Sequence, residues 1–150
     1  MSKVTVATVW LDGCSGCHMS LIDMDERLIE LAEVIDVVYS PLVDMKDYPE
    51  EVDVAIVEGA VSSTDDLKKI KKIREHTKIL IALGDCAVAA NVPAMRNPFK
   101  VDDIESRAYL ENVDLQPGVP REVVPPMLPI VRPMHEVVDV DVFVQGCPPS

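Results

Sequence analysis

Aromatic residues, basic residues and long apolar runs are all scarce in this sequence. Phe, Trp and Tyr make up only 4% of the chain while hydrophobic residues make up 48%, so an aliphatic interior is expected. Lys and Arg number 14 against 26 Asp and Glu, and the net charge of −12 argues against nucleic acid or an anionic membrane surface as partner. No apolar run approaches the length of a membrane span, and the N-terminal stretch lacks the features of a signal peptide. We therefore expect a cytoplasmic protein with no membrane partner.

Nucleotide-binding motifs are also missing. The sequence has neither a P-loop nor a Gly-x-Gly-x-x-Gly fingerprint. Its length suits a single domain, residues 1–150, with one ordinary core. Thiols stay reduced in the cytoplasm, so the four cysteines are expected to serve a metal or catalysis rather than disulfides.

Predicted strands and helices alternate along the chain, which is typical of a parallel α/β sheet. Apolar and β-branched runs predict strands at residues 4–10, 35–39, 52–57, 78–83 and 140–144.

Two helices are expected between these strands. Leu21, Met24, Leu28 and Leu31 recur at helical spacing, and a second helix follows N-cap candidates at 62–64 and carries Leu67, Ile70 and Ile73 inward. Ten of the twelve prolines lie at or beyond Pro93. Residues 93–133 are therefore predicted to be a long irregular connection with a helical turn at 102–110, which is functional or packs on a partner.

Each cysteine follows the end of a predicted strand. Cys14 and Cys17 follow the first strand, Cys86 the fourth and Cys147 the last. The carboxyl ends of parallel strands share one edge of the sheet, where ligands bind, so we expect the four thiols to meet there. Four of the six glycines lie within two residues before a cysteine, and glycine lets backbone amides approach an anionic centre such as an iron–sulfur cluster.

Other interpretations of the cysteines stay open at this point. Cys14-x-x-Cys17 by itself is compatible with a redox dithiol, but that leaves Cys86 and Cys147 unexplained. Four thiolates are also compatible with structural zinc, although zinc sites usually use two close pairs. Four unrelated buried cysteines would explain neither the strand-end positions nor the glycines. A four-cysteine iron–sulfur cluster explains both.

Three segments resemble a known family. The opening VWLDGCSGCHMSLIDMDERL, the GDCAV segment and the closing QGCPPS are similar to the small subunit of nickel–iron hydrogenases, in particular the cytoplasmic, NAD-coupled type. The resemblance implies a flavodoxin-like open parallel sheet with helices on both faces. It further implies one [4Fe–4S] cluster, with Cys14, Cys17, Cys86 and Cys147 as its ligands. The related subunit of respiratory complex I shares the fold but has two adjacent cysteines in place of Cys-x-x-Cys, so it ranks second.

The same resemblance implies a function that this chain performs only with partners. A large subunit would cleave H₂ at a nickel–iron centre, and this subunit would relay the electrons to iron–sulfur and flavin (diaphorase) subunits that reduce NAD⁺. Flavin mononucleotide is a further cofactor that a flavodoxin-like fold accommodates, although the sequence contains no phosphate site for it.

Three further residues lie beside the expected site. His18 follows Cys17, Asp85 precedes Cys86, and Glu58 ends the third strand. For His18 we weigh a hydrogen bond to the cluster or a partner contact against a plain position at a helix start. For the two carboxylates we weigh hydrogen bonding around the cluster against simple solvation at a strand end.

Overall fold

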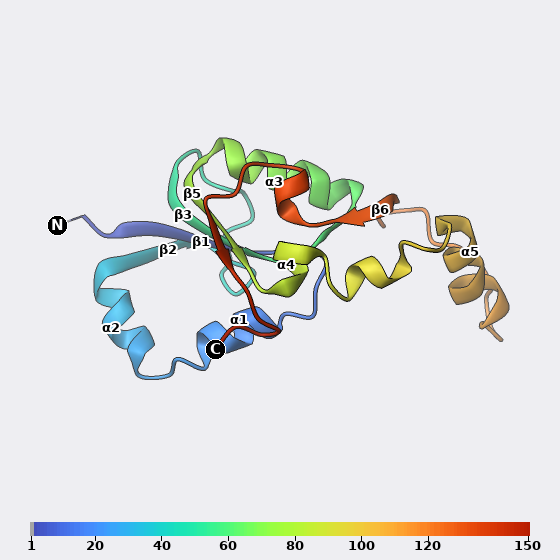
Figure 1. Cartoon of the computed structure of the whole chain (residues 1–150), viewed down its shortest axis with the longest axis horizontal. Helices are drawn as coiled ribbons and strands as arrows, with labels where there is room; N and C mark the ends of the chain where they lie inside the picture. The colour runs from blue at the N-terminus through green and yellow to red at the C-terminus, as the bar shows by residue number, and fades with distance from the viewer. Residues whose placement is uncertain (1) are drawn as a thin grey trace.

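Five parallel strands form the central sheet, in the order β2-β1-β3-β5-β7 (Figure 1). The structure is a computed structural model that describes residues 2–150. The strands are β1 (Val4–Trp10), β2 (Ile35–Tyr39), β3 (Val52–Glu58), β5 (Thr77–Leu83) and β7 (Val142–Val144). All five agree closely with the predicted ranges. The parallel α/β architecture expected from the sequence is confirmed.

The helices flank this sheet. They are α1 (Gly16–Ile22), α2 (Arg27–Val34), α3 (Thr64–Glu75), α4 (Asp85–Ala89) and α5 (Val101–Ser106), with short turns η1 (Pro93–Arg96), η2 (Arg107–Glu111) and η3 (Met134–Glu136). Figure 1 shows α3 on one side of the sheet and α1 and α2 on the other, so helices lie on both faces as predicted. No helix within residues 2–150 is long and apolar enough to cross a membrane.

Helix α3 has the strongest local sequence signals. Ser63 and Asp66 form a capping box, in which each side chain accepts a hydrogen bond from the other's backbone N–H. Ile70 and Ile73 are completely or almost completely buried against the sheet. The N-cap prediction at 62–64 and the inward face of this helix are therefore confirmed.

The main core lies between α3 and the sheet. Alternate residues of the three central strands, such as Val9, Val57 and Leu80, pack there with Ile70 and Ile73. Because side chains alternate across a strand, their neighbours in sequence point to the opposite face. That second face is much less covered, and Ile79 on it is 45% exposed.

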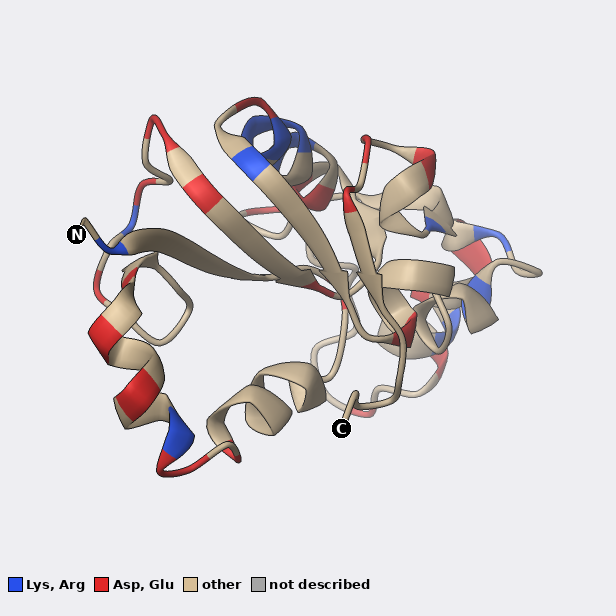
Figure 2. Cartoon of the chain, turned by 60° about the vertical axis from the view of Figure 1, so that its left-hand side comes forward, with Lys and Arg blue, Asp and Glu red and all other residues tan. Residues whose placement is uncertain are grey.

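The first predicted helix is two helices in the structure. Residues 23–26 separate α1 from α2, and Asp25 has a φ of 52°, which an α-helix does not accommodate. Helix α2 has no buried residue and stands off the sheet (Figure 2). Its two acidic residues, Glu30 and Glu33, are exposed. The apolar periodicity from Leu21 to Leu31 correctly predicted helical structure, but it did not predict the break between α1 and α2.

The proline-rich connection contains more structure than predicted. Strand β6 (Met127–Arg132) pairs antiparallel with β4 (Val61–Ser63) in a separate two-stranded sheet. Neither strand was predicted from the sequence. Pro129 argues against β6 inside a sheet, and the three residues of β4 overlap the N-cap candidates at 62–64. In a sheet of only two strands, β6 has a free edge, and a residue without an N–H is tolerated there. The predicted helical turn at 102–110 is present as α5 and η2.

Candidate metal centre

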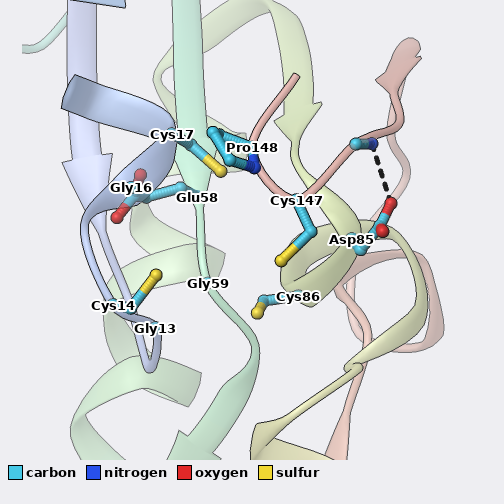
Figure 3. Close-up of a pocket in the computed structure, with 11 residues that line it drawn as sticks. Gly13, Cys14, Gly16, Cys17, Glu58, Gly59, Asp85, Cys86, Cys147 and Pro148 are labelled. Atoms are coloured by element: carbon cyan, nitrogen blue, oxygen red, sulfur yellow. Dashed lines mark hydrogen bonds between the residues drawn. The ribbon is translucent and has the colours of Figure 1, made fainter. Parts of the chain in front are cut away.

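Four cysteine side chains surround one cavity at the carboxyl edge of the sheet. Their sulfur atoms point into the space between the ends of β1, β3, β5 and β7 (Figure 3). The cavity has a volume of about 90 Å³, several times what one water molecule needs. It is lined by the cysteines together with Gly13, Gly16, Glu58, Gly59, Asp85, Gly146 and Pro148. The sequence predicted four thiols at one edge, and the structure brings them together.

The loop that carries Cys14 is held against the end of β3. The backbone N–H of Leu11 donates to the Glu58 carbonyl at 2.9 Å, and Asp12 and Ala60 form an antiparallel bridge. Gly59 lies between these contacts with a φ of +90°, and a Cβ there would lie 2.7 Å from the carbonyl carbon of Leu11. Only glycine permits this close approach of the two loops.

Cys86 and Cys147 are held together by a second set of hydrogen bonds. The N–H of Gly84 donates to the carbonyl of Val144 at 2.7 Å, and the N–H of Asp85 donates to the carbonyl of Gly146 at 2.9 Å. The Asp85 carboxylate in turn accepts the N–H of Gly146 at 2.8 Å, which is the dashed line in Figure 3. The loop after β7 is thereby locked onto the start of α4, and its cysteine faces the cavity.

Burial and nearby negative charge make the thiols of Cys17 and Cys86 costly to ionise without a cation. The pKa of Cys17 is raised from 9.0 to about 12, first by burial and then by the negative charges of Glu58 and of the other cysteines. Burial also raises the pKa of Cys86, while the backbone N–H of Val92 opposes that rise. Thiolates repel one another around this cavity, so positively charged metal would have to accompany their deprotonation.

This arrangement fits a group larger than a single ion. A zinc ion would need all of its sulfur ligands about 2.3 Å from one point. Within residues 2–150, no three His, Cys, Asp or Glu side chains converge closely enough to hold one metal ion. The sulfurs are distributed around a volume instead, which suits an iron–sulfur cluster held by four thiolates.

Glu58 and His18 are more deeply placed than the sequence indicated. Each is only 2% exposed, so the interpretation of Glu58 as a solvated strand-end carboxylate is wrong. Glu58 Oε2 accepts the backbone N–H of His18 at 2.8 Å, and Nδ1 of the His18 ring lies 3.0 Å from the same oxygen. The ring packs edge-on against Trp10, with centroids 5.4 Å apart. The sequence feature that could have indicated this burial is the position of Glu58 at the end of the central strand.

A family model matches most of the chain. The model of the NADH ubiquinone oxidoreductase 20 kDa subunit family matches residues 14–150. The delta subunit of the NAD-reducing hydrogenase HoxS of Cupriavidus necator is 43% identical over 153 residues, which cover 99% of this chain and 73% of that protein. A subunit of the F420-non-reducing hydrogenase of Methanocaldococcus jannaschii is 36% identical, and the match covers 98% of this chain but 52% of that protein. The chain thus spans about half the length of this archaeal relative.

Solved structures agree with these relatives. A chain of the NAD⁺-reducing [NiFe]-hydrogenase in the H₂-reduced state matches with a TM-score of 0.95 and 39% identity, over 99% of this chain and 85% of that one. A chain of the [NiFeSe]-hydrogenase of Dm. baculatum matches with a TM-score of 0.63 at 16% identity, which shows the shared fold alone. This chain therefore belongs to the NADH ubiquinone oxidoreductase 20 kDa subunit family, among its nickel–iron hydrogenase small subunits of the NAD-reducing type.

Proposed function

We propose that this chain relays electrons in an NAD-coupled nickel–iron hydrogenase, through one [4Fe–4S] cluster held by Cys14, Cys17, Cys86 and Cys147. The observation that carries the proposal is the position of the four thiols around one cavity, beyond the carboxyl ends of parallel strands. Cys14 and Cys147 lie on loops, and Cys17 and Cys86 lie in the first turns of α1 and α4. The 43% identity to a subunit of an NAD-reducing hydrogenase supports the assignment to that enzyme class.

The residues of the chain have distinct tasks in this proposal. When bound, a [4Fe–4S] cluster accepts and donates one electron at a time. Cys14 and Cys17 hold it from the β1 side, and Cys86 and Cys147 hold it from the β5–β7 side. Asp85 keeps the last two ligands in register through its hydrogen bond to Gly146. Because hydrogen bonds between the loops hold these ligands in place, little of the site has to move when the charge changes.

The remaining parts of the assembly are proposed to lie in partners. A large subunit would carry the nickel–iron centre, and iron–sulfur and flavin subunits would accept the electrons in the cytoplasm. This chain has no nucleotide-binding motif, so the flavin is proposed to lie in a partner subunit. Residues 1–150 would form the single cluster-binding domain of the assembly.

The test is metal analysis with low-temperature EPR on the anaerobically purified complex, before and after exposure to H₂. We expect about four irons per chain, nickel in the complex, and a cluster signal that develops on reduction by H₂. Cys86→Ala is expected to lower the iron content of this chain, because it removes one of four ligands. Met19→Ala is the matched control, since this side chain lies two residues after Cys17 and is 53% exposed.

The other outcomes lead to different assignments. Iron without nickel, and without a response to H₂, would favour a subunit of the complex I type, which the family description also covers. Zinc in place of iron would contradict the electron-transfer function itself. An unchanged iron content in Cys86→Ala would remove this residue from the ligand set.

A further inference from the structure

Within residues 2–150, Glu58 is the buried carboxylate that lines the cysteine cavity. It ends β3, the middle strand of the sheet, and is 2% exposed. A carboxylate loses much hydration on burial, so it is expected to have strong hydrogen-bond donors. Among the described residues, the donor to its Oε2 is the backbone N–H of His18, at 2.8 Å. Glu58 therefore contacts the chain immediately after Cys17.

This bond supplies a cap that α1 does not make for itself. An N-cap side chain usually accepts the N–H of the second or third helical residue. Ser15 holds the N-cap position of α1, but it has a φ of 67° and makes no side-chain cap bond. His18 is the third residue of this helix, and its N–H goes to Glu58 on another element of the fold. The first turn of α1, which includes Cys17, is thus fastened to the central strand.

The His18 side chain adds a second contact to the same oxygen. Its Nδ1 lies 3.0 Å from Oε2, although the ring is not aligned for a good hydrogen bond. Its Nε2 and the Nε1 of Trp10 are buried with no partner in the described structure. Buried nitrogens without a hydrogen-bond partner destabilise a fold, so stability alone does not account for this cluster. These buried polar groups of His18 and Trp10 lie beside the cysteine cavity, which indicates a functional role for them.

We propose that Glu58 is a positioning residue for Cys17: it caps α1 from the end of β3 and so sets where this sulfur meets the metal group. The inference rests on the proposed function, because it assumes that Cys17 is a ligand. The part of Glu58 that matters is its acceptor oxygen. Glutamine retains that oxygen and alanine does not, so the two substitutions separate the hydrogen bond from the rest of the side chain.

The experiment compares Glu58→Ala and Glu58→Gln in the purified complex with two readouts. Hydrogen–deuterium exchange of peptides covering residues 16–22 reports the α1 cap whether or not the cluster is present. Low-temperature EPR of the H₂-reduced complex reports the geometry of the cluster. We expect Glu58→Ala to speed exchange in α1 about tenfold or more and to shift the g-values. Glu58→Gln is expected to keep α1 protected and to keep the g-values close to the wild type.

Asp53→Ala is the matched control. Asp53 lies on the same strand and also accepts a backbone N–H, from Thr5 at 2.9 Å, but it sits near the opposite end of β3. Its loss is expected to leave the EPR signal and α1 exchange unchanged. Wild-type exchange and g-values in Glu58→Ala would overturn the inference, and so would a Gln variant as impaired as the Ala variant. Absence of iron from the wild type would refute the proposed function instead, while the exchange comparison would still decide the role of Glu58.

Discussion

Gly84 stands where another part of the chain passes too close for a side chain. It has a φ of +84°, and a Cβ at this position would collide with the sulfur of Cys17. The two residues are far apart in sequence: Gly84 is the N-cap of α4 after β5, and Cys17 lies in α1 after β1. A glycine before a cysteine therefore serves here to make room for a second cysteine across the cavity, in addition to turning the backbone.

Gly84→Ala is predicted to damage the site more than the fold. The added methyl group must displace Cys17, and the positive φ adds about 1–3 kcal/mol of backbone strain. We expect a lower iron content and a reduced free energy of unfolding, measured by metal analysis and urea denaturation. Gly118→Ala is the control, because a Cβ there would meet nothing within 4 Å. A Gly84→Ala protein with full iron content would contradict the predicted collision.

At the scale of elements, Asp53 ties three strands of the sheet together. On β3, it accepts the backbone N–H and the hydroxyl of Thr5 on β1, each at 2.9 Å, and it pairs with Lys78 on β5 at 2.9 Å. These contacts lower the pKa of Asp53 from 3.8 to about 2, with the Thr5 N–H as the largest cause. The ionised form of Asp53 is therefore more stable in the folded chain than in the unfolded chain.

The pH dependence of folding follows from the sign of this shift. A carboxyl group whose pKa is depressed by folding stabilises the fold above its unfolded pKa, and that stabilisation is lost as the pH falls through the folded value. We expect Asp53→Asn to be less stable than the wild type at pH 7. The difference should shrink between about pH 4 and pH 2. Urea denaturation of the metal-free chain across this range measures it, and a difference that does not change with pH would contradict the assignment.

At the scale of the whole molecule, the sheet has one well-covered face and one partly covered face. Helix α3 closes the first, whereas α1 and α2 stand clear of much of the second (Figures 1 and 2). The two faces should therefore contribute unequally to stability. Leu80 and Ile79 are adjacent on β5, and their side chains lie on opposite faces of the sheet. Their exposed fractions are 0% and 45%.

Truncating these two neighbours is predicted to give very different results. Leu80→Ala opens a cavity in the core and is expected to cost about 2–5 kcal/mol of unfolding free energy. Ile79→Ala removes a half-exposed side chain and is expected to cost about 1 kcal/mol or less. Urea denaturation of both variants provides the comparison. Equal losses would mean that the second face of the sheet is packed as tightly as the first.

Much of this architecture follows from local sequence patterns. The five strands were predictable because their apolar, β-branched runs are long and end at glycine or proline, and α3 because its cap, dipole charges and inward isoleucines all agree. Strand β6 was missed because a two-stranded sheet tolerates Pro129, which a central strand would exclude. Strand β4 was missed because it has only three residues, which overlap the N-cap candidates at 62–64. The break before α2 was missed because the apolar period continues across a residue with positive φ.

The parallel sheet and the association of its four strand-end cysteines could be predicted from the sequence, since periodicity and strand direction are local properties that fix which edge the loops share. What lies between and beneath those loops became visible only in the folded chain. Only the fold buries Glu58 under His18, places Gly84 against Cys17 and joins Asp85 to Gly146. These contacts link residues distant in sequence, and their energies depend on burial and on distances that no local pattern encodes.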